Sequence, residues 1–429
     1  MSRPQTLEEW LAYLETLHPN PIALGLDRVH EVLGRLAVRF DCPVLAVTGT
    51  NGKGSTCALL DAMLRSAGYR TGVYTSPHLL RYNERVRVGG KDASDDALIA
   101  AFNAVEDTRT AAGMPEIALT YFEFGTLAAF ILFMEAALDV VVLEVGLGGR
   151  LDAVNVVDAD VAVLTAIDID HVEYLGPDRA AVAREKAGIF RPGRPAICGD
   201  ANPPASLFEE ARSRGARLQR IGRDFGFAVQ GNQWRYFSAA GERFGLPLPA
   251  LRGEYQLANA ACAIAALEAL ASRLPVHAGA IREGLATAEL QGRFQVVPGR
   301  PTVVLDVAHN PQAARALAAT LGTMGFHPLT SAVVGMLRDK DIAGVIEAMR
   351  GRIDRWYVAP LPGPRGASAD AMRQSLLQAG IAAQAIVTCE SVAAALARAR
   401  EYASEADRIV AFGSFLTIAA ALETLPHRA

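Results

Sequence analysis

The stretch VLAVTGTNGKGST, residues 44–56, decides the fold of this chain. An apolar run rich in β-branched residues leads into the loop GTNGKGS at 49–55, and a helix-like segment follows at 57–68. A buried strand, a glycine loop with a lysine and a hydroxyl, and a helix form the layout of a nucleotide phosphate-binding loop. The glycines let backbone N–H groups approach phosphate oxygens, and the helix N-terminus adds positive partial charge there.

The loop departs from the common GxxxxGK[ST] form. Val47 stands where the first glycine would be, and Gly54 separates Lys53 from Ser55. This departure disfavours an ordinary kinase or GTPase and favours a variant class. The alternative is a plain glycine-rich turn between a strand and a helix, but the strand context and the lysine–serine pair favour a phosphate site.

The length and composition of the chain exclude several classes of protein and partner. The chain has 429 residues, enough for two or three domains, and its 51% apolar content is typical of a globular protein. A net charge of −4 without a basic run indicates no nucleic-acid partner. Five scattered cysteines without CxxC spacing indicate a reducing compartment and neither a disulfide framework nor a zinc site.

The termini and apolar runs predict a cytoplasmic protein. Residues 1–19 have an amphipathic helix pattern with acidic residues, which is unlike a signal peptide. The longest apolar stretches, near 126–147, are interrupted by Glu135 and Asp139. We therefore expect no membrane span and no membrane partner.

Strand and helix patterns alternate along most of the chain, which predicts an α/β fold. Parallel strands covered by helices on both faces are expected in the first part. Short strands joined by glycine turns at 222–252 predict a small antiparallel appendage. A second, smaller α/β series follows Gly299-Arg300-Pro301. We expect an ATP-binding domain at 1–295 and a Rossmann-like domain at 300–429, with the boundary near 294–301.

Acidic and histidine side chains follow two of the predicted strands. Glu144 ends an apolar strand, and Asp168, Asp170 and His171 follow another. Ligands of open parallel sheets bind outside the carboxyl ends of the strands, so these side chains are candidate Mg²⁺ ligands. The alternatives to metal binding are that Glu144 is an exposed acid at a strand end and that His171 is a structural histidine.

Three further segments carry polar candidates. Lys186, in REKAGIFRPG at 184–193, has the spacing of a solvated helical lysine. Arg293 lies at the domain junction, and Asp306 and His309 follow the first strand of the second domain, where a Rossmann-like sheet exposes its ligand edge. Turn residues are the alternative reading of these three. Ligand edges on two domains suggest substrates bound in a cleft between them.

Taken together, nine strings that occur in family order resemble the Mur ligase superfamily, and within it the dihydrofolate synthase/folylpolyglutamate synthase family, and the resemblance covers residues 14–417. The strings are GTNGKGS, SPHLLRYNERVRV, TYFEFGTLAAF, LEVGLGGRLDAVN, REKAGIFRPG, LQGRFQVV, LDVAHNP, GMLRDKD and AFGSFLT. The resemblance implies a P-loop-containing, Mur-ligase-like ATPase domain followed by the smaller Rossmann-like domain.

The resemblance also implies roles for individual residues. Nucleotide contacts are implied for Thr50, Asn51, Gly52, Lys53, Gly54, Ser55, Asn259, Arg293, Asp306 and His309. Ligands for two Mg²⁺ ions are implied at Ser76, Glu144, His171 and an N-carboxylated Lys186. Catalytic roles are implied for Lys53, His171, Lys186 and Arg293. The pterin-side substrate contacts implied are Ile22, Ala23, Leu24, Thr120, Tyr121, Phe122, Glu123, Leu151, Asp152 and Ala153. Ala23 is a departure, because the family carries an acid there.

The implied reaction adds L-glutamate to dihydropteroate and to reduced folates at the expense of ATP, through an acyl phosphate. We expect a monomer with only small-molecule partners. Three alternatives remain: a folylpolyglutamate synthase without the dihydrofolate synthase activity, a Mur-type ligase of cell-wall precursors, and a regulatory nucleotide switch without ligation. The polar ligand edge of the second domain disfavours a switch, which needs no acyl-acceptor site.

Overall fold

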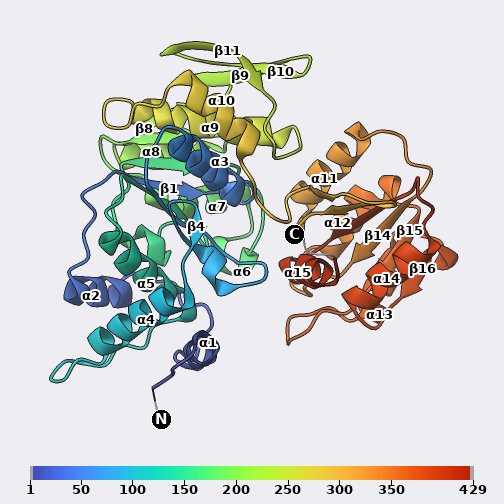
Figure 1. The fold of residues 1–429 in the computed structure, drawn as a ribbon, viewed down its shortest axis with the longest axis horizontal. Helices are drawn as coiled ribbons and strands as arrows, with labels where there is room; N and C mark the ends of the chain where they lie inside the picture. The colour runs from blue at the N-terminus through green and yellow to red at the C-terminus, as the bar shows by residue number, and fades with distance from the viewer. Residues whose placement is uncertain (1–2, 426–429) are drawn as a thin grey trace. The chain divides into compact units, whose positions relative to one another are not determined.

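The computed structural model describes residues 3–425 and divides the chain into two compact units (Figure 1). Unit 1 comprises Met1–Ala250 and Leu257–Ala288, and unit 2 comprises Leu251–Gln256 and Glu289–Ala429. The chain therefore passes through unit 2 briefly at Leu251–Gln256 and enters it again at Glu289, ahead of strand β12 (Gln295–Val297), which pairs with β13 (Thr302–Leu305).

Unit 1 is built on an eight-stranded sheet in the order β4-β3-β2-β5-β1-β6-β7-β8. Its strands are β1 Val44–Thr48, β2 Thr71–Tyr74, β3 Val86–Val88, β4 Lys91–Asp92, β5 Val140–Glu144, β6 Val161–Leu164, β7 Pro195–Cys198 and β8 Arg217–Arg220. Six strands run parallel, and β3 and β4 pair antiparallel at one edge. The predicted parallel sheet is confirmed, with the edge hairpin as an addition.

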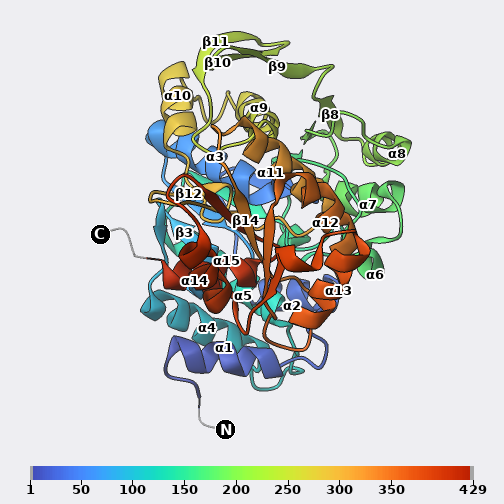
Figure 2. The same cartoon turned by 90° about the vertical axis from the view of Figure 1, so that its right-hand side faces the viewer.

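Helices cover both faces of this sheet. They are α1 Leu7–Thr16, α2 Asp27–Leu36, α3 Lys53–Ser66, α4 Asp95–Arg109, α5 Tyr121–Glu135, α6 Val172–Leu175, α7 Arg179–Lys186, α8 Ala205–Ser213, α9 Tyr255–Ala269 and α10 Ala278–Thr287. The 3₁₀ turns are η1 Tyr82–Arg85, η2 Ala153–Val156 and η3 Ala187–Ile189. Figure 1 shows α3, α9 and α10 on one side of β1 and α4 and α5 on the other, and Figure 2 shows the same separation of the two groups of helices.

The central strands β1, β2, β5, β6 and β7 are buried along their whole length, which explains their continuous apolar runs. Val44 and Ala46 of β1 belong to one core cluster with α1, α4 and α5, so the alternate residues of β1 point to the face that carries α3. Trp10 and Phe102 lie in this cluster with ring centroids 5.8 Å apart. Because α1 contributes Trp10, the N-terminal helix is part of the main core.

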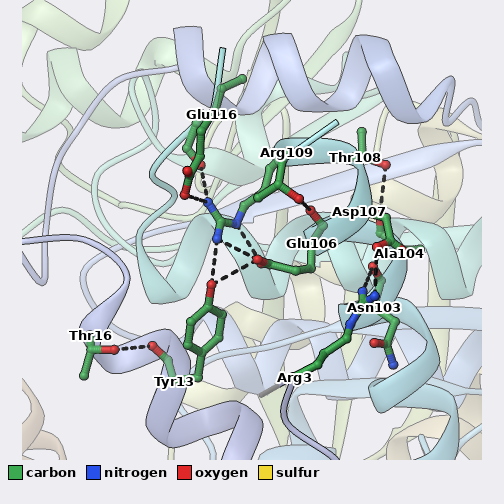
Figure 3. Close-up of polar contacts among 12 residues, drawn as sticks. Arg3, Tyr13, Thr16, Asn103, Ala104, Glu106, Asp107, Thr108, Arg109 and Glu116 are labelled. Carbon is green, nitrogen blue, oxygen red and sulfur yellow. Dashed lines mark hydrogen bonds and ion pairs between the residues drawn. The ribbon is translucent and has the colours of Figure 1, made fainter. Parts of the chain in front are cut away.

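A buried arginine holds the outer helices of unit 1 together (Figure 3). Arg109, at the end of α4, is only 1% exposed. Its guanidinium donates to both carboxylate oxygens of Glu106 at 2.7 Å, to Glu116 at 2.9 Å and to the Tyr13 hydroxyl of α1 at 2.7 Å. It also donates to the backbone oxygen of Ile117 at 3.2 Å. Arg109 thereby fixes the segment that leads from α4 into α5.

A three-stranded antiparallel sheet follows the parallel one, as predicted for residues 222–252. It consists of β9 Phe225–Gln230, β10 Gln233–Ser238 and β11 Gly241–Pro247. The hydroxyls of Tyr236 and Ser238 both donate to Glu268 of α9 at 2.8 Å. These bonds attach the small sheet to α9.

Unit 2 is the predicted smaller α/β domain. Its six-stranded sheet has the order β12-β13-β17-β14-β15-β16, all parallel except β12. Its remaining strands are β14 Thr330–Val334, β15 Arg355–Val358, β16 Ile386–Thr388 and β17 Arg408–Phe412. Its helices are α11 Pro311–Thr323, α12 Ile342–Met349, α13 Ala369–Gln378, α14 Val392–Tyr402 and α15 Phe415–Thr424, with 3₁₀ turns Arg350–Arg352 and Ala383–Ala385. Over residues 3–425, no helix is both long and apolar enough to cross a bilayer.

Candidate active site

The loop after β1 has the geometry that a phosphate site requires. The strand ends at Thr48 and α3 begins at Lys53, so the N-terminus of the helix faces the loop. Gly52 has φ +88°, and a Cβ there would lie 2.5 Å from the side-chain oxygen of Asn259. Glycine is therefore required at 52, and the predicted contact residue Asn259 of α9 lies against the loop.

Lys53 and Thr50 fix the shape of this loop. The Lys53 ammonium donates to the Gly49 carbonyl at 3.0 Å, which holds the side chain over the loop. The Thr50 hydroxyl donates to the backbone oxygen of Asp168 at 2.8 Å and accepts from its backbone N–H at 3.0 Å. Ser55 is buried in the first turn of α3. The loop is thus joined to the segment after β6 that carries His171.

Glu144 lies beside the phosphate loop at the carboxyl end of β5. It pairs in register with Val47 of β1, is 4% exposed, and accepts from the Ser76 backbone N–H at 3.2 Å. A buried carboxylate beside a phosphate loop fits a hard divalent cation such as Mg²⁺. Two predicted ligands, Glu144 and Ser76, therefore lie side by side.

His171 is the N-cap residue of α6 and has φ +51°, in the left-handed region. Its backbone N–H donates to the Asp170 carboxylate at 2.8 Å. Among residues 3–425, no three His, Cys, Asp or Glu side chains gather into a possible metal site. The predicted ligand set contains only two side chains of these types, His171 and Glu144, and its other members are a serine and a lysine.

Lys186 is the last residue of α7 and is only 3% exposed. The spacing-based interpretation of a solvated helical lysine is therefore wrong. Burial, and secondly the charge of Lys53, lower the pKa of Lys186 to about 7, while Asp170 and Asp152 act in the opposite direction. A large neutral fraction of a lysine amine at neutral pH is unusual, and it marks this side chain as chemically distinct.

The burial of Lys186 follows from the glycine-rich segment after β5. The Arg150 backbone N–H donates to the Glu185 carbonyl at 2.8 Å. A Cβ on Gly149 would lie 2.8 Å from the carbonyl oxygens of both Glu185 and Lys186. The backbone at Gly149 and Arg150 therefore packs directly on the end of α7. This contact joins residues about forty positions apart, so helical periodicity could not reveal it.

Asp152 holds the segment 146–156 in shape. Its carboxylate accepts from the backbone N–H groups of Leu147 at 2.7 Å and Val154 at 3.0 Å. Burial raises the pKa of Asp152 to about 6, although these backbone hydrogen bonds lower it. Asp152 was predicted as a substrate contact, and in the structure its carboxylate bonds to its own loop.

The three segments predicted to contact the substrate come together in unit 1. The Gly25 backbone N–H donates to the Leu151 carbonyl at 3.3 Å. Arg28 of α2 donates to the Ala23 carbonyl at 2.7 Å and to both carboxylate oxygens of Glu123 at 2.7 and 3.2 Å. Residues 22–24, 120–123 and 151–153 thus border one region. Sequence reasoning missed Arg28, because its role depends on an acid 95 positions away.

The start of α5 supplies aromatic walls to this region. Thr120 caps the helix by accepting from the Glu123 N–H. The Phe122 ring lies 2.7 Å from the position of a Cβ on Gly146, so glycine at 146 makes room for it. The Tyr121 ring lies 5.4 Å from the Arg85 guanidinium. A flat aromatic substrate could pack against such rings.

Unit 2 holds its own group of predicted residues at the carboxyl end of β13. Buried Asp306 accepts from the backbone N–H groups of Phe294 and Ala308, both at 2.8 Å. Burial raises the pKa of this carboxyl, against the lowering effect of Arg293 and of these hydrogen bonds. Asp306 therefore shapes the turn that carries Arg293.

Aromatic side chains of unit 2 surround this turn. The Arg293 guanidinium lies 5.1 Å from the centre of the Phe415 ring, and the His309 ring lies 6.3 Å from it. Burial and the charge of Asp306 raise the pKa of Tyr255. Sequence reasoning missed Tyr255 and Phe415. The string AFGSFLT contained Phe415, but nothing in it distinguishes this ring from a core phenylalanine.

Comparisons with known proteins agree with both units. Two family models match: the Mur ligase middle domain at residues 47–267, and the Mur ligase glutamate ligase domain at residues 292–415. The dihydrofolate synthase/folylpolyglutamate synthase of Escherichia coli (strain K12) is 47% identical over 98% of this chain and 96% of its own. The protein of the same name from Haemophilus influenzae is 41% identical over 96% of both chains.

Solved structures show the same fold. E. coli FolC in complex with DHPP and ADP has a TM-score of 0.92 at 47% identity, covering 98% of each chain. A bifunctional folylpolyglutamate synthase/dihydrofolate synthase with Mn, AMPPNP and L-glutamate bound has a TM-score of 0.89 at 46% identity, again over 98% of each chain. The chain therefore belongs to the Mur ligase superfamily, and within it to the dihydrofolate synthase/folylpolyglutamate synthase family.

Proposed function

We propose that this chain is an ATP-dependent ligase that adds L-glutamate to dihydropteroate, forming dihydrofolate, and to reduced folates, forming folylpolyglutamates. The loop 146–156 is the observation that supports this most directly. It packs on the backbone at Lys186 near the phosphate loop, and it also bonds to the 22–25 segment. One loop thus borders both the nucleotide region and the acceptor region, as phosphoryl transfer from ATP to an acceptor carboxylate requires.

The chemistry follows from the reactants. The acceptor carboxylate attacks the γ-phosphorus of ATP, which releases ADP and forms an acyl phosphate. The amine of L-glutamate then attacks the acyl carbon, and inorganic phosphate leaves from the tetrahedral intermediate. Lys53 stabilises the charge on the transferring group, and we assign Arg293, Asp306 and His309 of unit 2 to the nucleotide. Mg²⁺ held by Ser76, Glu144 and His171 would neutralise phosphate charge.

Lys186 is proposed to carry a carbamate that serves as a ligand for a second Mg²⁺. The neutral amine adds to CO₂ and loses a proton, which forms an N–C bond and an anionic group with two oxygens. A pKa of about 7 makes this neutral amine available. The modification also removes a positive charge that would otherwise face Lys53, and it supplies the oxygen ligands that Mg²⁺ prefers.

A substrate panel tests the function. Phosphate release from ATP would be measured with dihydropteroate plus glutamate, with tetrahydrofolate plus glutamate, with a UDP-muramyl precursor plus amino acids, and with no acceptor. We expect release with the first two mixtures only. Activity with tetrahydrofolate alone would leave a monofunctional folylpolyglutamate synthase. Activity with the muramyl precursor, or none above the background, would overturn the proposal.

A further inference from the structure

An arginine-lined cavity lies at the edge of the unit 1 sheet opposite to the phosphate loop. Its volume is about 340 Å³, and it opens where β6, β7 and β8 begin. Its polar lining is Asp160, Arg194, Arg217, Ser272 and Arg273. The phosphate loop follows the carboxyl end of β1, which pairs parallel with β6, so a strand length of ~13 Å separates the two edges. The cavity shares no residue with the candidate active site.

The charges in this cavity favour an anion. One carboxylate oxygen of Asp160 accepts from Arg194 at 2.8 Å and from Arg273 at 2.7 Å, and its other oxygen accepts from the Val44 N–H at 2.9 Å. This single acid therefore fixes two guanidinium groups in place. Three arginines against one aspartate leave a formal charge of +2. The carboxyl end of α9 lies here as well, and its partial charge of about −0.5 leaves the cavity positive.

The guanidinium groups have donors to spare. Each has five N–H donors, and Arg194 and Arg273 each use one on Asp160 while their side chains stay 54% and 46% exposed. The Arg217 side chain has no hydrogen bond or ion pair to any residue between 3 and 425. The backbone N–H groups of Gly193, Arg194 and Arg217 already donate to carbonyls. A ligand would therefore be held by guanidinium groups and by the Ser272 hydroxyl.

We propose that this cavity is a second anion site, which binds a small polyanion carrying carboxylate or phosphoryl groups. Planar guanidinium groups pair well with both kinds of group. The volume lies at the small end of ligand sites, which suits a short chain. One source would be phosphate released from ATP. The other would be the γ-linked glutamate tail of a folylpolyglutamate, and that source rests on the proposed function.

Calorimetry on the full-length chain saturated with Mg²⁺ and a non-hydrolysable ATP analogue tests this site, because the phosphate loop is then occupied. Inorganic phosphate and tri-γ-glutamate are titrated separately at low salt. Whichever of the two probes binds the unaltered chain, Arg217→Gln should weaken its binding about tenfold, since a charge-assisted hydrogen bond is lost. Arg212→Gln is the matched control, because Arg212 is an exposed arginine on α8 outside the cavity, and it should leave binding unchanged.

The two probes separate the sources. Phosphate binding alone indicates a phosphoryl ligand, and tri-γ-glutamate binding alone indicates the glutamate tail. Because Arg217 lies away from the active site, ligation by Arg217→Gln at saturating substrates should remain normal, which shows that the variant is folded. Failure of both probes to bind, or equal affinity in Arg217→Gln and the unaltered chain, would overturn the inference. The phosphate arm does not depend on ligase activity.

Discussion

At the scale of single residues, the environment of Lys186 determines its chemistry. The amine is buried close enough to Lys53 for the two charges to repel, and its pKa falls to about 7. A lowered amine pKa means that the neutral form dominates above pH 7 and the ammonium below it. Protonation at low pH therefore places a second buried cation in the site. A reaction that requires the neutral amine of Lys186 should therefore proceed less as the pH falls through 7.

We expect carbamylation and ligation to fall together between pH 8 and pH 6. The neutral fraction of Lys186 drops from about 90% to about 10% over this range. Added bicarbonate should partly restore activity near pH 7. NMR with ¹³C-bicarbonate would detect the carbamate directly. Lys186→Ala should lose ligation activity. Bicarbonate should not restore this activity, but a short carboxylate such as acetate should restore part of it. Absence of a carbamate resonance at pH 8 would contradict the assignment.

Arg28 is the second residue whose contacts define a role. It joins the Ala23 carbonyl to the buried carboxylate of Glu123. We expect Arg28→Ala to raise the KM for dihydropteroate about tenfold, because the 22–25 segment is released and Glu123 is left without its counter-ion. The KM for ATP should change little. Steady-state kinetics with each substrate varied in turn would measure both.

Arg3→Ala is the control for this prediction, since Arg3 forms an exposed ion pair with Asp107 and should leave both constants unchanged. Arg28→Lys should recover only part of the affinity, because an ammonium cannot make the paired contacts of a guanidinium. An equal rise in the KM of ATP and of dihydropteroate would argue against a specific role at the acceptor.

At the scale of elements, the decisive contact is that between the loop 146–156 and helix α7. It brings backbone against backbone, which only residues without a side chain allow. Gly188 repeats the arrangement from the other side, since a Cβ there would collide with the Arg150 backbone. The strings LEVGLGGRLDA and REKAGIF are therefore two halves of one packing contact.

Gly149→Ala should push the loop 146–156 away from the end of α7. The added methyl would lie 2.8 Å from two carbonyl oxygens, and backbone atoms cannot move aside as a flexible side chain can. We expect a loss of stability of about 1–3 kcal/mol and a larger loss of activity, because Lys186 is displaced. Chemical denaturation and kcat measurements would check both effects.

Gly34→Ala is the matched control. This glycine lies inside α2, and a Cβ there would meet nothing within 4 Å. Alanine should therefore leave stability unchanged or raise it by about 0.5–1 kcal/mol, through its helix propensity. Normal activity in Gly149→Ala would show that the loop does not position Lys186.

At the scale of the whole molecule, each unit contributes its own polar strand edge. The edge of unit 2 is organised by Asp306, which accepts two backbone N–H groups and shapes the turn that carries Arg293. If residues of both units bind the nucleotide, a change at this edge should lower the affinity for ATP without altering the phosphate loop of unit 1.

Asp306→Ala is therefore expected to raise the KM for ATP about tenfold or more, since two backbone hydrogen bonds are lost and Arg293 is no longer held. Asp306→Asn should be milder, because the amide oxygen can still accept. A variant in which only the KM for glutamate moves would show that unit 2 binds the amino acid alone. Initial rates at varied ATP and varied glutamate distinguish the two.

Local patterns predicted the fold well, and long-range contacts account for what was missed. The strand, loop and helix at 44–66, the antiparallel strands at 222–252 and the second α/β series were all readable, because each depends on neighbouring residues. Lys186 looked solvated because the loop that buries it lies some forty residues earlier. Arg28 and Tyr255 carried no signal, since their partners are distant in sequence. β12 was missed because three residues are too few for a pattern.

The loop 146–156 has a consequence for the design of variants. Its Leu151 carbonyl accepts from the Gly25 N–H of the segment proposed to contact the acceptor, and its backbone packs against that of Lys186. A mutation selected to admit a different acceptor would therefore also perturb phosphoryl transfer, and grafting the loop from a relative would transplant both properties at once. Under the proposed function, acceptor choice and turnover are therefore coupled in this scaffold. Directed evolution toward new pterins should thus yield compensating changes on α7.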